Sequence, residues 1–285
     1  MAEATRPFYE DVQSHYDLSD DFFSLFLDPS RTYSCAYFRD EGMTLAEAQL
    51  AKIDLSLGKC DLRPGQTLLD VGCGWGATAR RAAEKYGVRV IGLTLSRNQQ
   101  QHAQRLAAGR SDLEFRLQGW EEFDQPVDRI ISIGAMEHFR IERYPAFFER
   151  CRKVLPRDGR MLLHLIVQGN RETLQPGQPE FDEDLVAYIK FIKKHIFPGG
   201  QVPPREVVTS HAEAAGFKVT QTQSLRPHYA RTLDQWAANL EAAREAAIAV
   251  TSPAIYDRYM FYLTRSAHYF RTGHCDVVQF TCEVT

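Results

Sequence analysis

The sequence predicts an α/β fold in which mostly parallel strands are covered by helices on both faces. Short apolar runs alternate along the chain with stretches of helical periodicity, and the first of these runs ends in a cluster of glycines. The runs lack the apolar–polar alternation of a half-exposed strand, which is typical of strands buried on both faces. A chain of 285 residues is long enough for one large domain with a sizeable core.

The first part of the chain supplies most of the predicted sheet. Thr67 to Gly74 is an apolar run that ends in a tight turn, and Ala79, Ala82 and Ala83 then follow at the spacing of one helix face. The next elements are strands at 88–95, 113–117, 127–133 and 161–167, with helical stretches at about 97–108 and 144–151. Alternation of this kind favours parallel pairing.

The last part of the chain adds further helices and strands. A helix is predicted at about 205–215, a strand at 219–225 and a final strand at 277–282. Two helical stretches lie between those strands. Trp236 lies on the apolar face of the first, and Ser252 followed by Pro253 fits the cap and first position of the second.

Two regions lie outside this alternation. Residues 1–60 contain the aromatic-rich run Phe22–Leu27 and then a capping box formed by Thr44 and Glu47. Residues 168–204 contain a helical stretch that is apolar on more than one side. Such a helix is either buried in the core or lines an apolar cavity, and the sequence leaves both interpretations open.

Composition excludes several classes of protein. Lys and Arg total 34 against 37 Asp and Glu, and the net charge of −3 argues against a dedicated nucleic-acid binder. The mean hydropathy of −0.36 and the lack of a long apolar run predict a soluble chain without a membrane span. No secretory signal is recognisable, and the six cysteines form no CxxC pair, so we expect a cytoplasmic protein with reduced thiols and no metal site.

The strongest local signal is the run Asp70-Val-Gly72-Cys-Gly74-Trp-Gly76 between the first strand and the first helix. Glycines there let a ligand approach the backbone and leave the helix N-terminus facing it. The spacing GxGxG departs from the dinucleotide fingerprint GxGxxG. An ordinary glycine turn is the alternative, but the strand–turn–helix context favours a loop that holds a nucleotide-like cofactor.

This loop resembles that of the S-adenosylmethionine (SAM) methyltransferases of the class I, Rossmann-like type. The resemblance implies a mostly parallel seven-stranded sheet with helices on both faces. The usual family has an acidic residue at the end of the second strand, whereas Gly92-Leu-Thr-Leu95 has none.

Further motifs resemble one subfamily that departs in this way. They are His15-Tyr-Asp-Leu-Ser-Asp-Asp-Phe-Phe23, Tyr33-Ser-Cys-Ala-Tyr-Phe38, Gly92-Leu-Thr-Leu-Ser96, Gly119-Trp-Glu121, Glu137-His-Phe139, Phe197-Pro-Gly-Gly200 and His228-Tyr-Ala230. Together they resemble the cyclopropane fatty acid synthases, above all the mycolic acid cyclopropane synthases and related mycolate methyltransferases. The resemblance covers nearly the whole chain.

Carried across position by position, the resemblance implies which residues contact SAM. They are Tyr33, Ser34, Asp70, Gly72, Gly74, Thr94, Leu95, Gln99, Trp120 and Glu121. A core aromatic is the alternative for Trp120, but a tryptophan beside a carboxylate suits an adenine ring and its amino group.

The resemblance also implies a catalytic group that holds a bicarbonate ion near the transferred methyl group. It comprises Glu137, His164 and Tyr229, with Cys35 and Ile133 acting through their backbones. On the residues alone, Glu137 is equally a turn cap and His164, in an apolar run, a hydrogen-bonded core residue. Methyl transfer to an alkene leaves a carbocation, which an anion and aromatic faces stabilise before a base removes a proton.

The implied reaction is SAM-dependent addition of a methylene to a cis double bond of a long, mycolic acid-type acyl chain. A cyclopropane forms and S-adenosylhomocysteine is released. The alternatives are a related mycolate methyltransferase that gives a hydroxyl- or methyl-branched product, and a non-catalytic SAM- and lipid-binding homologue. Ser266 stands where many relatives carry a cysteine, and no covalent step requires a nucleophile there.

The resemblance suggests that an acyl carrier protein presents the chain. Lys190, Lys193 and Lys194 form either a basic docking patch for it or an ordinary solvated helix face. Peripheral membrane contact is compatible with a lipid substrate, and the oligomeric state is not indicated. We expect one domain over residues 1–285: an N-terminal helical cover (1–60), a cofactor-binding core (67–167), a helical insertion over the acyl chain (168–204) and the remaining sheet and helices (205–285).

Overall fold

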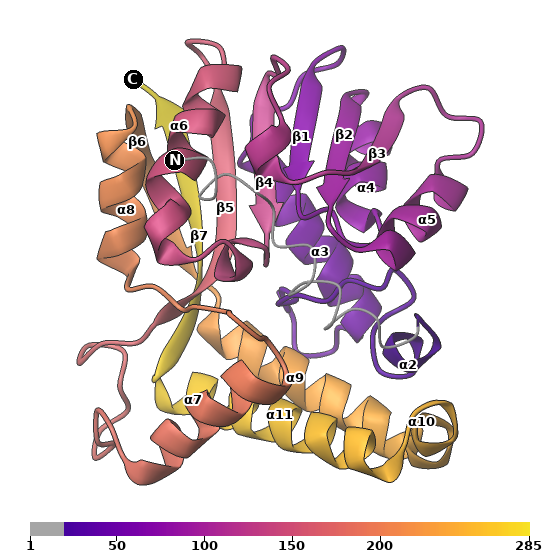
Figure 1. Cartoon of the computed structure of the whole chain (residues 1–285), viewed down its shortest axis with the longest axis vertical. Helices are drawn as coiled ribbons and strands as arrows, with labels where there is room; N and C mark the ends of the chain where they lie inside the picture. Colours follow the sequence, from indigo (N-terminus) through magenta and orange to yellow (C-terminus); the bar gives the residue numbers. More distant parts are fainter. Residues whose placement is uncertain (1–19) are drawn as a thin grey trace.

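The computed structural model describes residues 20–285 and is built on a seven-stranded sheet with the strand order β3-β2-β1-β4-β5-β7-β6 (Figure 1). Strands β1 to β5 are parallel, and β7 is antiparallel to both β5 and β6. The strands are β1 (Thr67–Val71), β2 (Arg89–Thr94), β3 (Leu113–Leu117), β4 (Arg129–Ile133), β5 (Arg160–Gln168), β6 (Phe217–Ser224) and β7 (Cys275–Val284). The mostly parallel α/β fold is therefore confirmed.

Helices cover both faces of the sheet, as the alternation predicts. Apolar side chains of α3 (Leu45–Gly58), α4 (Ala77–Tyr86) and α5 (Arg97–Leu106) pack with one face, in a core that includes Leu68 and Ile131. Those of α6 (Tyr144–Val154) and α8 (Arg205–Ala214) pack on the other, with Leu69 and Ile130. Neighbouring strand residues thus face opposite cores, which explains the unbroken apolar runs.

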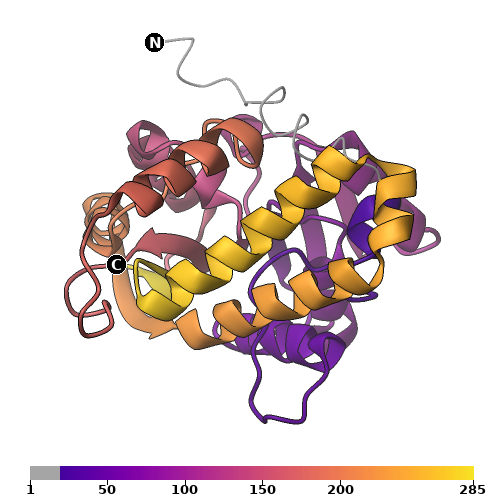
Figure 2. The ribbon, with the colours of Figure 1, turned by 90° about the horizontal axis from the view of Figure 1, so that it is seen from below.

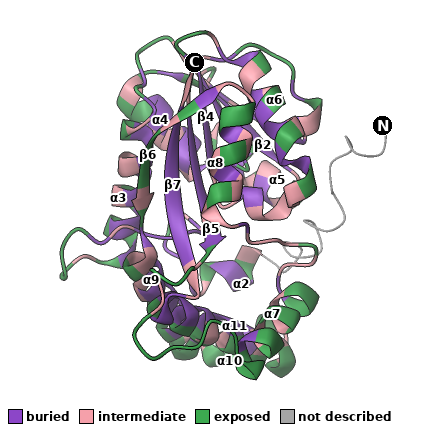
Figure 3. Ribbon diagram, turned by 90° about the vertical axis from the view of Figure 1, so that its left-hand side faces the viewer, coloured by how far each residue is buried: buried purple, intermediate pink, exposed green. Residues whose placement is uncertain are grey.

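A third group of helices lies beyond the carboxyl ends of β1 to β5 (Figures 1 and 2). It consists of α2 (Asp20–Ser24), α7 (Glu183–His195), α9 (Arg226–Ala242), α10 (Arg244–Val250) and α11 (Pro253–Thr272). Aromatic rings dominate its core, where Phe26 packs against Trp236 and Tyr259. Figure 3 shows that β7 is buried along most of its length, whereas α7 and α10 expose much of theirs.

Some predicted elements differ from the observed ones. The capping box at the start of α3 is present, with Glu47 Oε2 accepting the Thr44 N–H at 2.8 Å. The sequence predicted two helices between β6 and β7, but the chain forms three: α9, α10 and α11. The alanine-rich stretch around Ala243 contains no glycine or proline to mark the break. The expected N-terminal cover and the motif at 15–23 fall partly on residues 1–19, outside the described residues.

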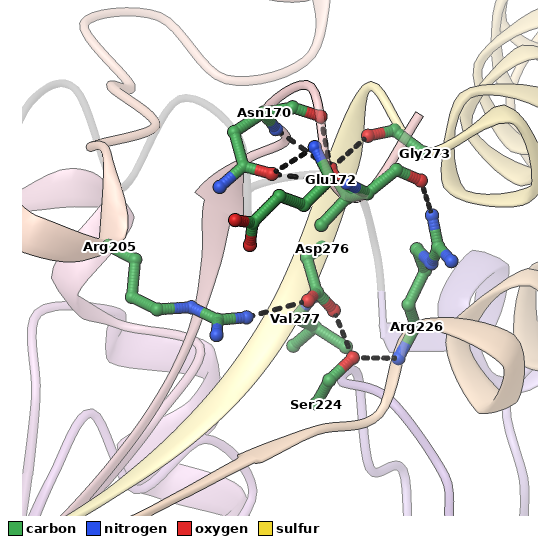
Figure 4. Close-up of polar contacts among 9 residues, drawn as sticks. Asn170, Glu172, Arg205, Ser224, Arg226, Gly273, Asp276 and Val277 are labelled. Atoms are coloured by element: carbon green, nitrogen blue, oxygen red, sulfur yellow. Dashed lines mark hydrogen bonds and ion pairs between the residues drawn. The ribbon is translucent and has the colours of Figure 1, made fainter. Parts of the chain in front are cut away.

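The amino end of β7 is anchored by Asp276, a buried carboxylate (Figure 4). Its Oδ1 accepts hydrogen bonds from Ser224 Oγ and the Val277 N–H, both at 2.7 Å. Its Oδ2 accepts one from Arg205 Nη2 at 3.0 Å. The carboxylate therefore joins β6, β7 and α8 where β7 leaves the helical layer.

The segment 169–175 is held against the turn between α11 and β7 by its backbone. The Gly169 N–H donates to the His274 carbonyl at 2.8 Å, and Thr173 Oγ1 donates to the Gly273 carbonyl at 2.9 Å. The Arg226 guanidinium donates to the Thr173 carbonyl (Figure 4). The two backbones are so close that a Cβ on Gly169 would lie 1.9 Å from the Gly273 oxygen.

Gly169→Ala should therefore destabilise the fold. The added methyl group must push two hydrogen-bonded backbones apart, and we expect the free energy of unfolding, measured by urea titration, to fall by about 2–3 kcal/mol. Gly42→Ala is the matched control, because a Cβ at Gly42 would meet no atom within 4 Å. Equal stability of the two variants would contradict the close backbone approach.

Candidate active site

A glycine loop joins β1 to α4 and forms one side of a cleft. Gly72, Gly74 and Gly76 adopt positive φ angles of 82°, 54° and 92°, which glycine reaches without strain. A Cβ on Gly72 would lie 2.4 Å from the Cβ of Ala135, so no larger residue fits there. The Gly72 N–H donates to the Leu93 carbonyl at 2.9 Å, which holds the loop against the end of β2.

The cleft has a volume of about 130 Å³ and lies at the carboxyl ends of β1, β2 and β4. Every residue that the resemblance assigned to the cofactor lines it: Tyr33, Ser34, Asp70, Gly72, Gly74, Thr94, Leu95, Gln99, Trp120 and Glu121. Strand order reverses between β1 and β4 at this point, which is where ligands bind in open α/β sheets. The fold thus gathers the whole predicted set around one cleft.

Asp70 and Lys52 are buried ionisable residues on the wall of the cleft. Oδ2 of Asp70 has no hydrogen-bond partner among residues 20–285. Burial raises the pKa of this carboxyl to about 7, against the opposing charge of Lys52. Lys52 Nζ donates to Ser34 Oγ at 2.8 Å, and burial lowers the pKa of the ammonium to about 8. Because an unsatisfied buried oxygen is costly, Asp70 is suited to accept a hydrogen bond from a ligand.

A neutral pair stands where the usual methyltransferase has an acidic residue. Thr94 Oγ1 donates to Gln99 Oε1 at 2.7 Å, and both side chains are buried. Because the amide oxygen is engaged, the amide N–H groups of Gln99 are left for a ligand in the cleft. Ser96 caps α5 by accepting the Gln99 N–H, which fixes the position of the glutamine.

Trp120 and Glu121 begin the short helix η2 (Trp120–Glu122) on the opposite side of the cleft. The Trp120 ring packs edge-on against Phe147, with 5.4 Å between centroids, so it is part of the core as well as of the cleft. Arg143 Nη1 donates to Glu121 Oε1 at 3.0 Å, while Oε2 has no partner among the described residues. Burial raises the pKa of Glu121, and Arg143 opposes the shift.

A second cavity, of about 600 Å³, continues from the cleft into the helical layer. Tyr33, Ser34, Gly134 and His138 line both spaces, so they form the junction between them. The second cavity is lined mainly by apolar and aromatic side chains of α7, α9, α11 and β5, such as Leu185, Tyr188, Ile192, Leu233, Tyr262 and Phe270. Its size and character suit a long apolar ligand.

Helix α7 is the apolar helical stretch that the sequence predicted within residues 168–204, either as a buried core helix or as the lining of a cavity. Leu185, Tyr188 and Ile192 line the cavity, while Val186 is 41% exposed. The interpretation as a fully buried core helix is therefore wrong. The helix is apolar on more than one side because one face borders the cavity and another carries exposed apolar residues.

Glu137 and His164 line the second cavity, and each has a buried polar atom without a hydrogen-bond partner among the described residues. Glu137 lies in η3 (Met136–His138), just after β4, and its Oε1 accepts the Ile166 N–H at 2.8 Å. Its Oε2 has no partner among residues 20–285, and burial raises the pKa of the carboxyl to about 7. His164 lies on β5, with Nδ1 3.2 Å from Gln279 Nε2 and Nε2 without a partner among the same residues.

The protonation of His164 is set by burial. Burial, followed by the charges of Lys52 and Lys59, holds the pKa of the imidazole well below its usual range. His164 is therefore neutral at physiological pH. A neutral imidazole and a carboxyl that titrates near neutrality form a donor and acceptor set that fits a small oxyanion such as bicarbonate.

The remaining predicted catalytic residues line the second cavity or the cleft beside it. Tyr229, in the first turn of α9, lines the second cavity and packs on Phe270 with 4.6 Å between ring centroids. Cys35 also lines that cavity, and burial raises the pKa of its thiol, which excludes a thiolate nucleophile. Ile133 lines the cofactor cleft instead, next to the shared residue Gly134.

Two buried polar residues were not among the sequence candidates. Lys52 lies in α3 one helical turn after Ala48, so a lysine on an apolar helix face was the available signal. Gln279 reaches His164 because β7 pairs antiparallel with β5 and places the two residues side by side. Ser266 lines the second cavity, where its hydroxyl and that of Tyr188 share a hydrogen bond.

The chain matches the family model described as mycolic acid cyclopropane synthetase over residues 3–280. Cyclopropane mycolic acid synthase 1 of Mycobacterium tuberculosis is 55% identical, over 99% of this chain and 100% of the relative. Cyclopropane mycolic acid synthase 3 of the same organism is 56% identical, again over 99% of this chain and 100% of the relative.

Solved structures give the same result. The cyclopropane synthase MmaA2 from Mycobacterium tuberculosis superposes with a TM-score of 0.94 at 54% identity, covering 97% of this chain and 98% of the other. The mycolic acid cyclopropane synthase CmaA1 complexed with SAH and CTAB gives 0.93 at 56%, covering 98% and 99%. Coclaurine N-methyltransferase, at 22% identity and a TM-score of 0.80, shares the fold. The chain belongs to the mycolic acid cyclopropane synthetase family.

Proposed function

We propose that this protein is a SAM-dependent C-methyltransferase that adds a methylene to a cis double bond of a long acyl chain, of the mycolic acid type, to form a cyclopropane. The observation that carries the proposal is the junction at Tyr33, Ser34, Gly134 and His138, where the cofactor cleft meets an apolar cavity. A family member holds SAH and CTAB, a single-chain amphiphile, in one structure. That complex supports a site that takes a cofactor and an alkyl chain at the same time.

SAM, when bound, supplies the methyl group, and the chain's own residues hold it in place. The glycine loop would admit the amino-acid half of the cofactor, and Asp70 Oδ2 would accept from its ammonium group. Gln99 would donate to the ribose, and Glu121 Oε2 would accept from the adenine amino group beside Trp120. Each of these side chains lines the cleft, and both carboxylates have an unsatisfied oxygen among the described residues.

The second set of residues deals with the positive charge that methyl transfer creates on the acyl chain. The aromatic faces of Tyr33, Tyr229 and Tyr262 line the cavity and stabilise a cation. Bicarbonate, when bound, would supply the base for ring closure. Glu137 and His164 would hold it by side-chain atoms, with the backbones of Cys35 and Ile133 beside them.

The setting also favours ring closure over capture of the cation by water. The cavity is lined largely by apolar side chains, which disfavour the water needed to capture the cation as an alcohol. We keep the hydroxyl- and methyl-branched products as outcomes of the test. A non-catalytic homologue would bind SAM and transfer no methyl group.

We further propose that the substrate arrives on an acidic acyl carrier protein. Three lysines in the second half of α7 are exposed: Lys190, Lys193 and Lys194. Lys193 also lines the second cavity, which we call the acyl cavity from here on. No helix among residues 20–285 is both long and apolar enough to cross a membrane. We infer a cytoplasmic enzyme in which the chain acts as one catalytic unit, with residues 168–204 covering the acyl chain.

The proposed reaction predicts a defined product. In a host that supplies unsaturated long-chain acyl groups, expression of the protein with methyl-labelled methionine should add one labelled carbon per modified double bond. Mass spectrometry separates an alcohol from the ring, because the alcohol carries one additional water. A branched alkene has the same mass as the ring, and proton NMR separates these two by the vinylic proton of the alkene. Accumulation of alcohol or branched alkene would identify a sister activity, and SAM binding without any labelled lipid would contradict catalysis.

Glu137→Gln should retain SAM binding and lose most turnover. The amide still accepts the Ile166 N–H but no longer titrates, so we expect kcat to fall by about 100-fold or more. Glu142→Gln is the control, because Glu142 is exposed on a neighbouring turn. Undiminished turnover of Glu137→Gln would remove Glu137 from the mechanism.

SAM affinity should fall with acidification. Asp70, with its pKa raised to about 7, is ionised above that pH and attracts the cofactor ammonium; this attraction is lost as pH falls through about 7. Lys52, whose charge acts on Asp70 and whose own pKa is lowered to about 8 by burial, keeps most of its charge in this range. Calorimetry between about pH 5.5 and pH 7.5 should show close to tenfold weaker binding per unit below the pKa. Asp70→Asn should bind weakly and without this dependence; an unchanged slope would contradict the assignment.

A further inference from the structure

A chain of polar side chains lies behind His164, on the side away from the acyl cavity. Lys59 Nζ donates to Gln279 Oε1 and to Gln223 Oε1, both at 2.6 Å. Gln279 Nε2 in turn reaches His164 Nδ1 at 3.2 Å. Neither Lys59 nor Gln279 lines either cavity, so neither touches a ligand bound there.

Lys59 is an unusual residue to place here. It is partly buried, and among residues 20–285 no carboxylate lies within ion-pair distance of its ammonium. Burial of a charge that has no opposite charge beside it costs free energy. The two partners of the Lys59 ammonium are neutral amides, so a stabilising ion pair does not explain why the lysine is placed here. What the ammonium does do is fix the direction of the Gln279 amide.

Two contacts give the Gln279 amide the same orientation. An ammonium only donates, so Oε1 of Gln279 must point toward Lys59. On the other side, the Ser56 hydroxyl already donates to the Lys52 carbonyl at 2.8 Å. Ser56 Oγ can therefore only accept from Gln279, at 2.9 Å, which requires the amide nitrogen on that side.

This orientation decides which nitrogen of His164 carries the proton. The amide nitrogen only donates, so Nδ1 of His164 must accept and the imidazole proton lies on Nε2. Nε2 is the atom that has no partner among the described residues, and His164 lines the acyl cavity together with Glu137. The low pKa of His164 keeps the ring neutral, so the tautomer persists across the physiological range.

We infer that Lys59, Ser56 and Gln279 are positioning residues that fix His164 as its Nε2–H tautomer and so direct an N–H donor at the anion held beside Glu137. The catalytic consequence rests on the proposed function, whereas the tautomer does not. Without this chain, the neutral ring has a second tautomer that presents a lone pair to the anion and repels it.

The tautomer is measured directly by NMR of protein carrying ¹⁵N-labelled histidine. There are nine histidines, and the variant His164→Gln identifies the signal of His164 by its loss. The expected pattern is a protonated Nε2 and an unprotonated Nδ1. A proton on Nδ1 in the unaltered protein overturns the inference.

Gln279→Glu tests the cause. A carboxylate only accepts hydrogen bonds, so it favours a proton on His164 Nδ1. The NMR pattern is then reversed, or both ring nitrogens are protonated and the ring is charged. We expect kcat to fall about 10- to 100-fold, as for removal of other orienting partners, with unchanged SAM affinity. Gln223→Glu is the matched control: it places the same charge beside Lys59 and leaves the contact between Gln279 and His164 intact. It should keep the original pattern and turnover.

A second variant covers a failure of Gln279→Glu to fold. Lys59→Met removes one of the two contacts that orient the Gln279 amide and leaves the contact with Ser56, so a mixture of tautomers and an intermediate loss of turnover are expected. An unchanged NMR pattern and unchanged turnover in both variants overturn the inference. If the unaltered protein binds SAM but transfers no methyl group, the proposed function fails, while the tautomer pattern still decides this inference.

Discussion

In the proposed reaction a positive charge forms on a hydrocarbon chain inside a largely apolar cavity, and the surroundings of the proposed active site follow from that constraint. The cation needs negative charge and aromatic faces close by, yet isolated charges in an apolar cavity are costly. The ionisable groups that the protein places at the site are buried, and burial shifts their pKa values in the direction that favours the neutral form. Glu137 and Asp70 both have pKa values raised to about 7, and His164 is held neutral.

The layout of the chain separates the two tasks of the site. Parallel strands β1, β2 and β4 end at the cofactor cleft, whereas helices α7, α9 and α11 form most of the acyl cavity. The contact between them is limited to a few residues, including Tyr33 and Gly134. In the proposed reaction, methyl donor and acceptor meet at the junction of the sheet with the helical layer (Figure 1).

Sequence patterns predicted the sheet and the glycine loop because both depend on local signals, whereas the other residues of the cleft were assigned by the family resemblance. Buried strands are continuous apolar runs, and the loop at Gly72 needs glycine for its backbone angles and close contacts. The orientation of His164 had no such signal, because Gln279 is far away in sequence and reaches it only through the antiparallel pairing of β7. The break between α9 and α10 was missed because no glycine or proline marks it.

The two sides of the acyl cavity differ in what holds them. Segment 169–175 is fastened by backbone hydrogen bonds to the α11–β7 turn, with no room for even a methyl group at Gly169. Helix α7 is held to α11 by side-chain contacts, such as Tyr188 with Ser266 and Asp184 with Arg265. Side-chain contacts can be exchanged while a helix shifts, whereas a backbone ladder cannot. The cavity therefore has one wall fastened by backbone hydrogen bonds and one fastened by side chains, and a change in cavity shape is expected first at α7.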